Sequence, residues 1–238
     1  MKAAVSDYFT HLDTESADPV ADLRVRMEAG GVEHALVVEM WNGAIREAMR
    51  GLRERGEKWC SLAFCLREPF PRDFERGAIV RVLTSQLEQP GPWLKILARR
   101  DGLLLPHAES GIGPLCAALR PIIETHPQLR VYVPHLGWPT RDKRPDPAWP
   151  LAMDWLGKHA NVILGVSALS HFSTQEWPHE DIRLLSESSL RAFGPERLAA
   201  GTDYPYLDKP RYGAYLALSC DWIRRQWPCW SEPDVFPR

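Results

Sequence analysis

The chain has 238 residues, of which 45% are hydrophobic and 25% charged, and its formal net charge at pH 7 is −2. A chain of this size and composition can bury a core without disulfides or a structural metal, so we expect a single domain over residues 1–238. The scattered Lys and Arg residues argue against nucleic acid as a partner, and the lack of a signal-peptide pattern or a run of about 20 apolar residues predicts a cytoplasmic protein that does not bind membranes.

Short apolar runs alternate with amphipathic segments along the chain, which is the pattern of repeated βα units around a parallel sheet. Eight runs have the length and the Val, Ile, Leu or Ala content of buried strands. Eight is also the number that a closed barrel requires, so the predicted fold is a (β/α)₈ TIM barrel. The runs comprise residues 3–9, 34–40, 59–66, 78–84, 102–107, 130–137, 161–169 and 198–205.

Helices are predicted over residues 19–30, 44–56 and 113–126, between these runs. Residues 139–150, which contain four prolines, and residues 170–178 are predicted to be longer loops on the substrate-binding face of the barrel.

The C-terminal stretch contains Trp222, Trp227 and Trp230. We expect these rings to cover the core, and the alternative is a subunit contact in a homodimer. The five cysteines, an odd number without a C-x-x-C pair, suit a reducing compartment and are interpreted as structural residues.

Three of the predicted strands end in a residue that can bind a metal or transfer a proton. These residues are His107, His135 and Asp203. A polar side chain that closes an apolar barrel strand points into the mouth where the βα loops converge. Any one of them could be a hydrogen-bonded structural residue, but three in the same position predict a functional site.

Three segments resemble the amidohydrolase-related barrel family, which includes metal-dependent decarboxylases and lactonases. Residues 193–205, FGPERLAAGTDYP, are similar to the family motif that delivers the aspartate of the eighth strand. Residues 126–139 and 27–39 resemble its sixth-strand motif and its entry into the second strand. The resemblance covers nearly the whole chain and implies the same barrel.

The resemblance also implies roles for individual residues. Asp203 would be the metal-binding or proton-transferring carboxylate, His107 the metal ligand of the fifth strand, and His135 a group on the substrate side. Members usually carry Asp-x-His-x-His in the first strand, whereas this chain has Phe9 between Asp7 and His11. His11, His107 and Asp203 remain as a possible ligand set for one divalent metal, zinc or manganese. The alternative is that the site uses no metal, in which case Asp203 activates water as a general base.

Four further residues are candidates for binding the substrate. Arg67 and Arg81 could bind a carboxylate, although Arg81 could instead pair with Glu88 or Glu109. His171 could line the mouth, and Phe9 could serve an aromatic substrate. A cluster of basic residues in the loop at 139–150 is either a further carboxylate site or a solvated surface; it consists of Arg141, Lys143 and Arg144.

The leading hypothesis is an enzyme, a hydrolase or carbon–carbon lyase that acts on a small cyclic or carboxylated molecule. Alternatives are a metal-independent lactonase, or a catalytically silent barrel that serves as a binding or scaffold subunit. The joint presence of His107, His135 and Asp203 favours the enzyme.

Overall fold

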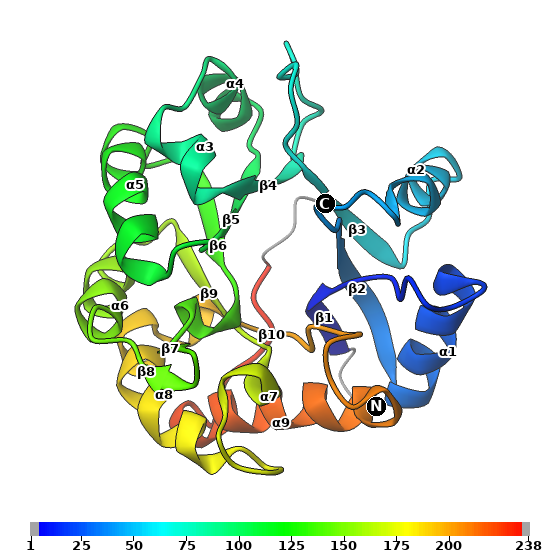
Figure 1. Cartoon of the computed structure of the whole chain (residues 1–238), viewed down its shortest axis with the longest axis vertical. Coiled ribbons are helices and arrows are strands. Elements are labelled where there is room, and N and C mark those ends of the chain that lie inside the picture. The colour runs from blue at the N-terminus through cyan, green and yellow to red at the C-terminus, as the bar shows by residue number, and fades with distance from the viewer. Residues whose placement is uncertain (1–4, 235–238) are drawn as a thin grey trace.

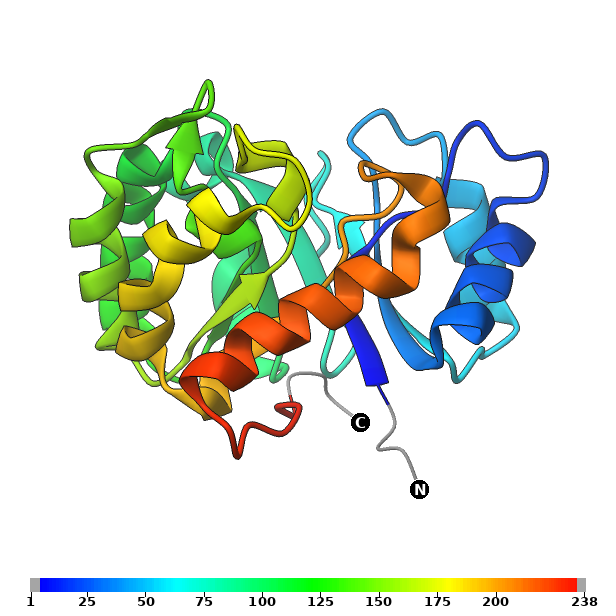
Figure 2. The ribbon, with the colours of Figure 1, turned by 90° about the horizontal axis from the view of Figure 1, so that it is seen from below.

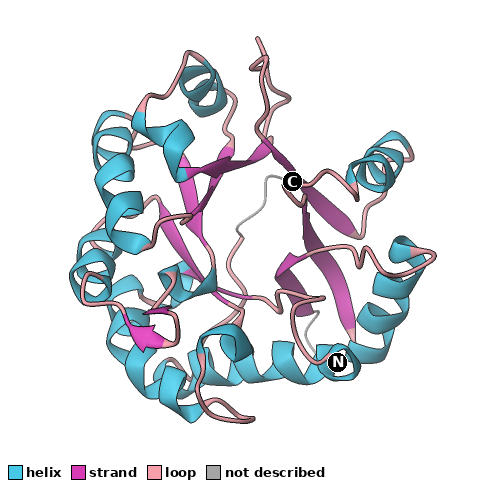
Figure 3. Cartoon of the chain, in the orientation of Figure 1, coloured by secondary structure: helices cyan, strands magenta, loops and turns pink. Residues whose placement is uncertain are grey.

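The computed structural model describes residues 5–234. In these residues, eight parallel strands form one sheet that curls into a barrel inside a layer of helices (Figures 1 and 3). Each strand pairs with its neighbour in chain order, which confirms the predicted barrel. The strands are β1 (Val5–Thr10), β2 (Val32–Val38), β3 (Cys60–Cys65), β4 (Ile79–Leu83), β5 (Leu103–His107), β6 (Arg130–Val133), β9 (Val162–Val166) and β10 (Leu198–Ala200).

Capping and helix-breaking residues in the sequence set the ends of the helices. In the first of them, the Asp18 side chain accepts a hydrogen bond from Ala21 N at 3.0 Å, Pro19 takes the first position, and left-handed Gly31 ends the helix. The α-helices are α1 (Pro19–Gly30), α2 (Arg46–Glu54), α3 (Thr84–Glu88), α4 (Trp93–Arg99), α5 (Ile112–Thr125), α6 (Trp149–Gly157), α7 (Leu169–Phe172), α8 (Glu180–Phe193) and α9 (Tyr212–Gln226). Three short 3₁₀ turns are η1 (His135–Gly137), η2 (Pro195–Arg197) and η3 (Lys209–Arg211).

The loop predicted over residues 139–150 contains structure of its own. Two short antiparallel strands, β7 (Thr140–Arg141) and β8 (Arg144–Pro145), form a hairpin, and α6 begins within the same segment. The three basic side chains of the hairpin are exposed.

One βα unit departs from the regular architecture, because residues 66–78 between β3 and β4 contain no helix (Figure 1). Pro69 and Pro71 lack the backbone N–H that a helix would use, and they disfavour helical geometry in the residues before them. The outer face of β3 is therefore incompletely covered, and Leu62 and Phe64 are half-buried. A cavity of about 1230 Å³ lies there, on the flank of the barrel.

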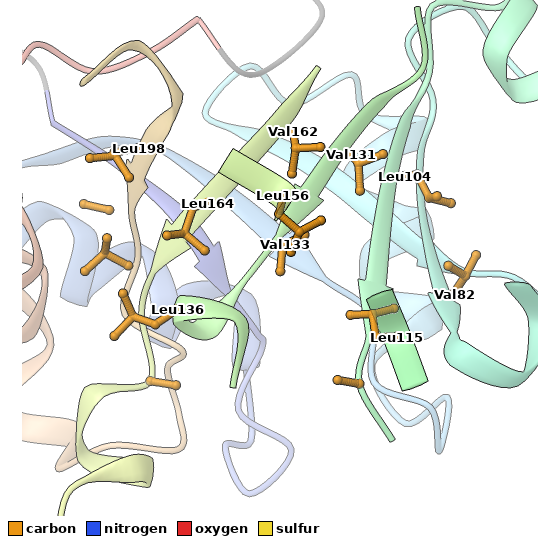
Figure 4. Close-up of a cluster of buried hydrophobic side chains, with 14 of the residues drawn as sticks. Val82, Leu104, Leu115, Val131, Val133, Leu136, Leu156, Val162, Leu164 and Leu198 are labelled. Atoms are coloured by element: carbon orange, nitrogen blue, oxygen red, sulfur yellow. The ribbon is translucent and has the colours of Figure 1, made fainter. Parts of the chain in front are cut away.

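Two apolar layers form the core. The inner layer fills the barrel with side chains such as Phe9, Ile79, Leu105 and Tyr132. The outer layer lies between the strands and the helices, where Val131 and Leu164 of the sheet pack near Leu115 and Leu156 of the helices (Figure 4). Because both faces of the strands are buried, they appear in the sequence as continuous apolar runs.

The barrel closes between its first and last strands through the segment that follows β10. Thr202 N and Asp203 N both donate to Phe9 O, and His11 N donates to Tyr204 O at 2.7 Å. The fully buried Asp7 side chain reinforces this seam, because it accepts hydrogen bonds from Thr202 N at 2.9 Å and Thr202 Oγ1 at 2.7 Å.

Burial raises the pKa of Asp7 to about 6, although its hydrogen bonds with Thr202 act in the opposite direction. The folded state therefore retains this proton more strongly than the unfolded chain does. The stabilisation of the folded state by protonated Asp7 is complete below the pKa that the group has in the unfolded chain. It is lost as pH rises through the pKa that the group has in the folded state. An Asp7→Asn variant keeps donors and acceptors without the charge, so its free energy of unfolding relative to wild type should rise by about 1 kcal/mol between pH 5 and pH 8.

Urea unfolding at the two pH values measures this difference. Asp154→Asn is the matched control, since that side chain is 65% exposed and pairs with Lys158 on the surface, and its difference from wild type should not change. A pH-independent difference for Asp7→Asn would contradict the assignment.

The C-terminal helix α9 lies along the outside of the barrel between α8 and α1, as Figure 2 shows in orange and red. Trp222 and Trp230 are buried in the outer core, which confirms that they cover it, and Trp227 packs against the same core. The homodimer contact stays a prediction. Among residues 5–234, no helix is both long and apolar enough to cross a lipid bilayer.

All five cysteines are free thiols, as expected, and only Cys229 is exposed. Burial raises the pKa of the other four, Cys60, Cys65, Cys116 and Cys220, to about 12. These thiols are therefore protonated and unreactive near neutral pH.

Candidate active site

Asp203 lies at the carboxyl ends of the strands, between two imidazole rings. Its Oδ1 is 3.6 Å from His11 Nε2 and 3.8 Å from His135 Nε2. Both distances exceed a normal hydrogen bond, as is common in active sites without substrate. Because parallel strands end at the same rim, residues that follow β1, β6 and β10 meet at one point.

His11 is held by the neighbouring strand. Its Nδ1 lies 2.6 Å from Val38 O, and because a carbonyl oxygen can only accept, Nδ1 must carry a proton. Nε2 is therefore the atom that faces the Asp203 carboxylate. The ring is 2% exposed, so its orientation is fixed by packing as well as by this bond.

His135 sits in a left-handed turn that ends the predicted run at 130–137 early, since β6 stops at Val133. The four residues from His135 to Trp138 have φ between 52° and 67°, a conformation that costs about 1–2 kcal/mol for each non-glycine residue. Strain of this kind persists where the surrounding structure enforces it, often at functional sites.

Ser167, which follows β9, fixes the His135 ring. Its Oγ accepts the His135 backbone N–H at 3.2 Å and lies 3.0 Å from Nδ1. Burial lowers the pKa of His135 to about 3, so the ring is neutral at pH 7. When the Ser167 hydroxyl donates to Nδ1, the single ring proton is on Nε2 and faces Asp203.

Asp203 itself has a left-handed backbone, with φ of 66°, and is 8% exposed. Burial alone would raise its pKa. The charge that His135 carries when it is protonated, the hydrogen bond and charge of His11, and the charge on Arg81 outweigh burial and lower the pKa of Asp203 below its ordinary value. Since His135 is neutral at pH 7, Arg81 is a lasting source of positive charge beside this carboxylate.

Phe9 and Arg81 lie at the floor of the mouth. Phe9 is fully buried, and its ring centroid is 5.2 Å from that of His11 and 4.4 Å from that of His135. Arg81 is 5% exposed, and its Nη1 donates to Glu39 O at 2.6 Å. It therefore points inward, toward the mouth, and the alternative pairing with Glu88 or Glu109 is not what the structure has.

Aromatic rings surround the mouth. Trp138 packs edge-on against His107 and His135, with centroid distances of 5.6 and 5.4 Å. Trp41 lies 6.4 Å from His107, and Tyr206, which is 52% exposed, lies 5.7 Å from His11. Such a rim suits an organic ring better than a fully hydrated ion.

Two of the predicted substrate-binding residues have other positions. The Arg67 guanidinium donates to the buried Glu39 carboxylate at 3.0 Å and to Trp41 O at 2.9 Å, so it braces the rim. His171 is exposed, and its ring packs against Phe172.

The predicted metal ligands do not fit a metal centre. Within residues 5–234, no three His, Cys, Asp or Glu side chains are placed to hold a metal ion. His107 packs against Trp138 and Trp41, whereas Asp203 contacts His11 and His135. The phenyl ring of Phe9 and the cation of Arg81 occupy the floor beneath them. The structure does not bring His11, His107 and Asp203 together as a three-ligand set, and metal binding by these residues stays a prediction from the resemblance.

Sequence reasoning did not single out five residues that shape this site, namely Glu39, Trp41, Trp138, Ser167 and Tyr206. A signal existed for most of them, because each follows a strand by one to six residues, but the sequence does not tell which loop side chains turn inward.

A cavity of about 420 Å³ lies outside the mouth, between the loop before α8 and the start of α9, and it is lined by Trp177, Arg211 and Tyr215 among others.

A sequence model of a family described as Amidohydrolase matches residues 74–223, which is more than half of the chain. The L-fucono-1,5-lactonase of Burkholderia ambifaria is 34% identical over 108 residues, which are 42% of this chain and 36% of the lactonase. The aligned part of the chain thus spans about a third of the length of that lactonase.

Solved structures share the whole fold at low identity. An amidohydrolase from Burkholderia multivorans, crystallised with bound zinc, has a TM-score of 0.67 and 15% identity, over 96% of this chain and 93% of that one. A putative 2-pyrone-4,6-dicarboxylic acid hydrolase from Pseudomonas putida has a TM-score of 0.65 and 17% identity, over 95% and 94% of the two chains.

Proposed function

Because the chain belongs to the amidohydrolase family, we propose that it is a hydrolase that opens a small cyclic ester at the mouth of the barrel, with Asp203 as the general base. The family relation itself supports an enzyme of the hydrolase or decarboxylase type. The observation that supports hydrolysis of a cyclic ester is the buried Asp203 carboxylate, which faces two imidazole Nε2 atoms inside an aromatic rim.

The nature of the similar proteins favours a lactone as the substrate class. L-fucono-1,5-lactone and 2-pyrone-4,6-dicarboxylic acid, in the names of two of them, are both six-membered cyclic esters. The rim of Trp41, Trp138 and Tyr206 offers apolar faces to such a ring.

Hydrolysis requires a base, an acid and a donor for the developing oxyanion. Asp203, whose lowered pKa keeps it ionised at neutral pH, takes a proton from water while the water oxygen attacks the ester carbonyl. The ring C–O bond then breaks, and the leaving oxygen receives the proton held by Asp203, either directly or from His135 Nε2, which then recovers a proton from Asp203. The product is an open hydroxy acid. Because the residues do not fit a metal centre, no step is assigned to a metal ion.

The test is a pH-stat assay on L-fucono-1,5-lactone, other 1,5-lactones and 2-pyrone-4,6-dicarboxylate, which measures acid release above the spontaneous rate. We expect saturable hydrolysis of at least one of them. Carbon dioxide release from an aromatic carboxylic acid, without lactone hydrolysis, would identify a decarboxylase instead. Failure on both substrate classes, with ligand binding retained, would favour the silent barrel.

A further inference from the structure

Two buried hydrogen-bond donors at the floor and rim of the mouth have no partner within residues 5–234. Arg81 Nε and Trp41 Nε1 are both inaccessible to solvent and make no hydrogen bond to any residue of this range. Their groups are adjacent, with Arg81 Cζ 5.3 Å from the Trp41 ring centroid. An unsatisfied buried donor costs about 1–3 kcal/mol, so two in one place call for an explanation.

The pairing of β4 shows how Arg81 comes to lie there. Arg81 is opposite Leu105 in the neighbouring strand, and side chains alternate along a strand, so Arg81 shares the inward face with Ile79 and the inner core. Its Cζ is 5.9 Å from the centroid of the Phe9 ring, so the guanidinium and the phenyl ring are neighbours at the floor of the mouth.

The charges around the mouth make Arg81 distinctive. Burial lowers the pKa of Arg81, but a guanidinium stays protonated in proteins. The site thus has a permanent cation next to the Asp203 carboxylate.

We propose that Arg81 is the fixed cation of this site in place of a metal ion, and that Arg81 Nε and Trp41 Nε1 hold the carbonyl oxygen of the substrate as it becomes negative. This inference is built on the proposed ester hydrolysis. A guanidinium and an indole N–H in a site shielded from water can stabilise an oxyanion. Because both donor atoms are covered in the free protein, the substrate oxygen reaches them when the half-buried Trp41 ring turns as the substrate binds. The same positive charge disfavours the binding of a divalent cation to His11 and Asp203.

Zinc titration tests the exclusion of metal without relying on activity. Calorimetry of chelator-treated wild type with zinc should show no stoichiometric site, whereas a Phe9→His/Arg81→Met double variant should bind about one zinc per chain. Stoichiometric zinc in the wild type that is lost in Asp203→Asn would overturn the proposal. That result would leave ester hydrolysis standing, with a metal.

Kinetics test the oxyanion contact on whichever lactone is hydrolysed. Arg81→Met should lower kcat by about 10²–10³-fold with KM changed less than about threefold, and guanidinium ion should partly rescue Arg81→Ala. The acid limb of the kcat–pH profile should move to higher pH in Arg81→Met, because Asp203 loses a neighbouring cation. A rise in KM alone would mean that Arg81 binds the substrate but not the oxyanion, and would refute this assignment.

Trp41→Phe tests the proposal even if the Arg81 variants fold poorly. The substitution removes the indole N–H from a half-buried ring and keeps an aromatic face, and we expect kcat to fall about tenfold. An unchanged kcat would contradict the role of Trp41. If the wild type hydrolyses no lactone, the proposed function fails while the zinc titration still decides whether Arg81 excludes a metal.

Discussion

Asp203→Asn is expected to lower kcat for ester hydrolysis by about 10³–10⁴-fold while the barrel stays folded. The amide cannot accept a proton from water, so the general base is lost. Asparagine is nearly the same size and tolerates the left-handed backbone that Asp203 has, with φ of 66°. The Asp203 N–H donates to Phe9 O through the main chain, and that bond is unaffected by the substitution.

The measurement is kcat and KM at pH 7.5, with thermal unfolding of both proteins as the check on folding. Asp208→Asn is the matched control, because that exposed carboxylate follows in the same segment and pairs with Arg211. We expect it to keep wild-type kcat. Activity of Asp203→Asn within tenfold of wild type would show that another group activates the water.

Glu39→Ala is expected to reduce the free energy of unfolding by about 2–3 kcal/mol. The Glu39 carboxylate is fully buried and accepts hydrogen bonds from Cys65 N at 2.7 Å, Arg46 at 3.1 Å and Arg67 at 3.0 Å. Its loss leaves the buried Cys65 N–H without this acceptor. The loss should be smaller than for a fully buried ion pair, because the arginine side chains are 27% and 40% exposed and can turn toward water.

Chemical denaturation at pH 7.5 gives the difference. Glu75→Ala removes a largely exposed partner of Arg53 and should change the unfolding free energy by less than about 0.5 kcal/mol. Equal effects of the two substitutions would mean that Glu39 is not a brace between β2, β3 and the rim. Glu39→Gln, which keeps an acceptor for Cys65 N, should fall between them.

The barrel could be predicted because its strands are buried on both faces and so appear as apolar runs between amphipathic helices. The helix-free connection after β3 was less visible, although Pro69 and Pro71 mark it. The run at 130–137 was extended too far, since a left-handed turn at His135 leaves no trace in hydrophobicity. The positions of His107, His135 and Asp203 at or just after the ends of strands could be predicted, because the apolar runs mark where the strands end.

The chemistry of the site depends on orientations that the sequence does not contain. A charged side chain within an apolar strand predicted that Arg81 either faces the mouth or pairs with an acid, and only the packing of the folded chain distinguishes these two positions. His107 ends β5 and His11 follows β1, yet His107 packs against the tryptophans and His11 faces Asp203. Trp41 and Tyr206 belong to loops whose direction is set by tertiary contacts.

The helix-free connection between β3 and β4 also indicates where residues can be inserted into the chain without disturbing the barrel. The two strands pair directly from Ala63–Ile79 to Cys65–Arg81, so their alignment does not require a covering helix. Lengthening a flexible connection costs only about 0.6 kcal/mol per doubling. Residues 66–78 are therefore the natural place for an insertion, whether acquired in evolution or engineered, and an added amphipathic helix would find the half-buried Leu62 and Phe64 as a ready packing surface.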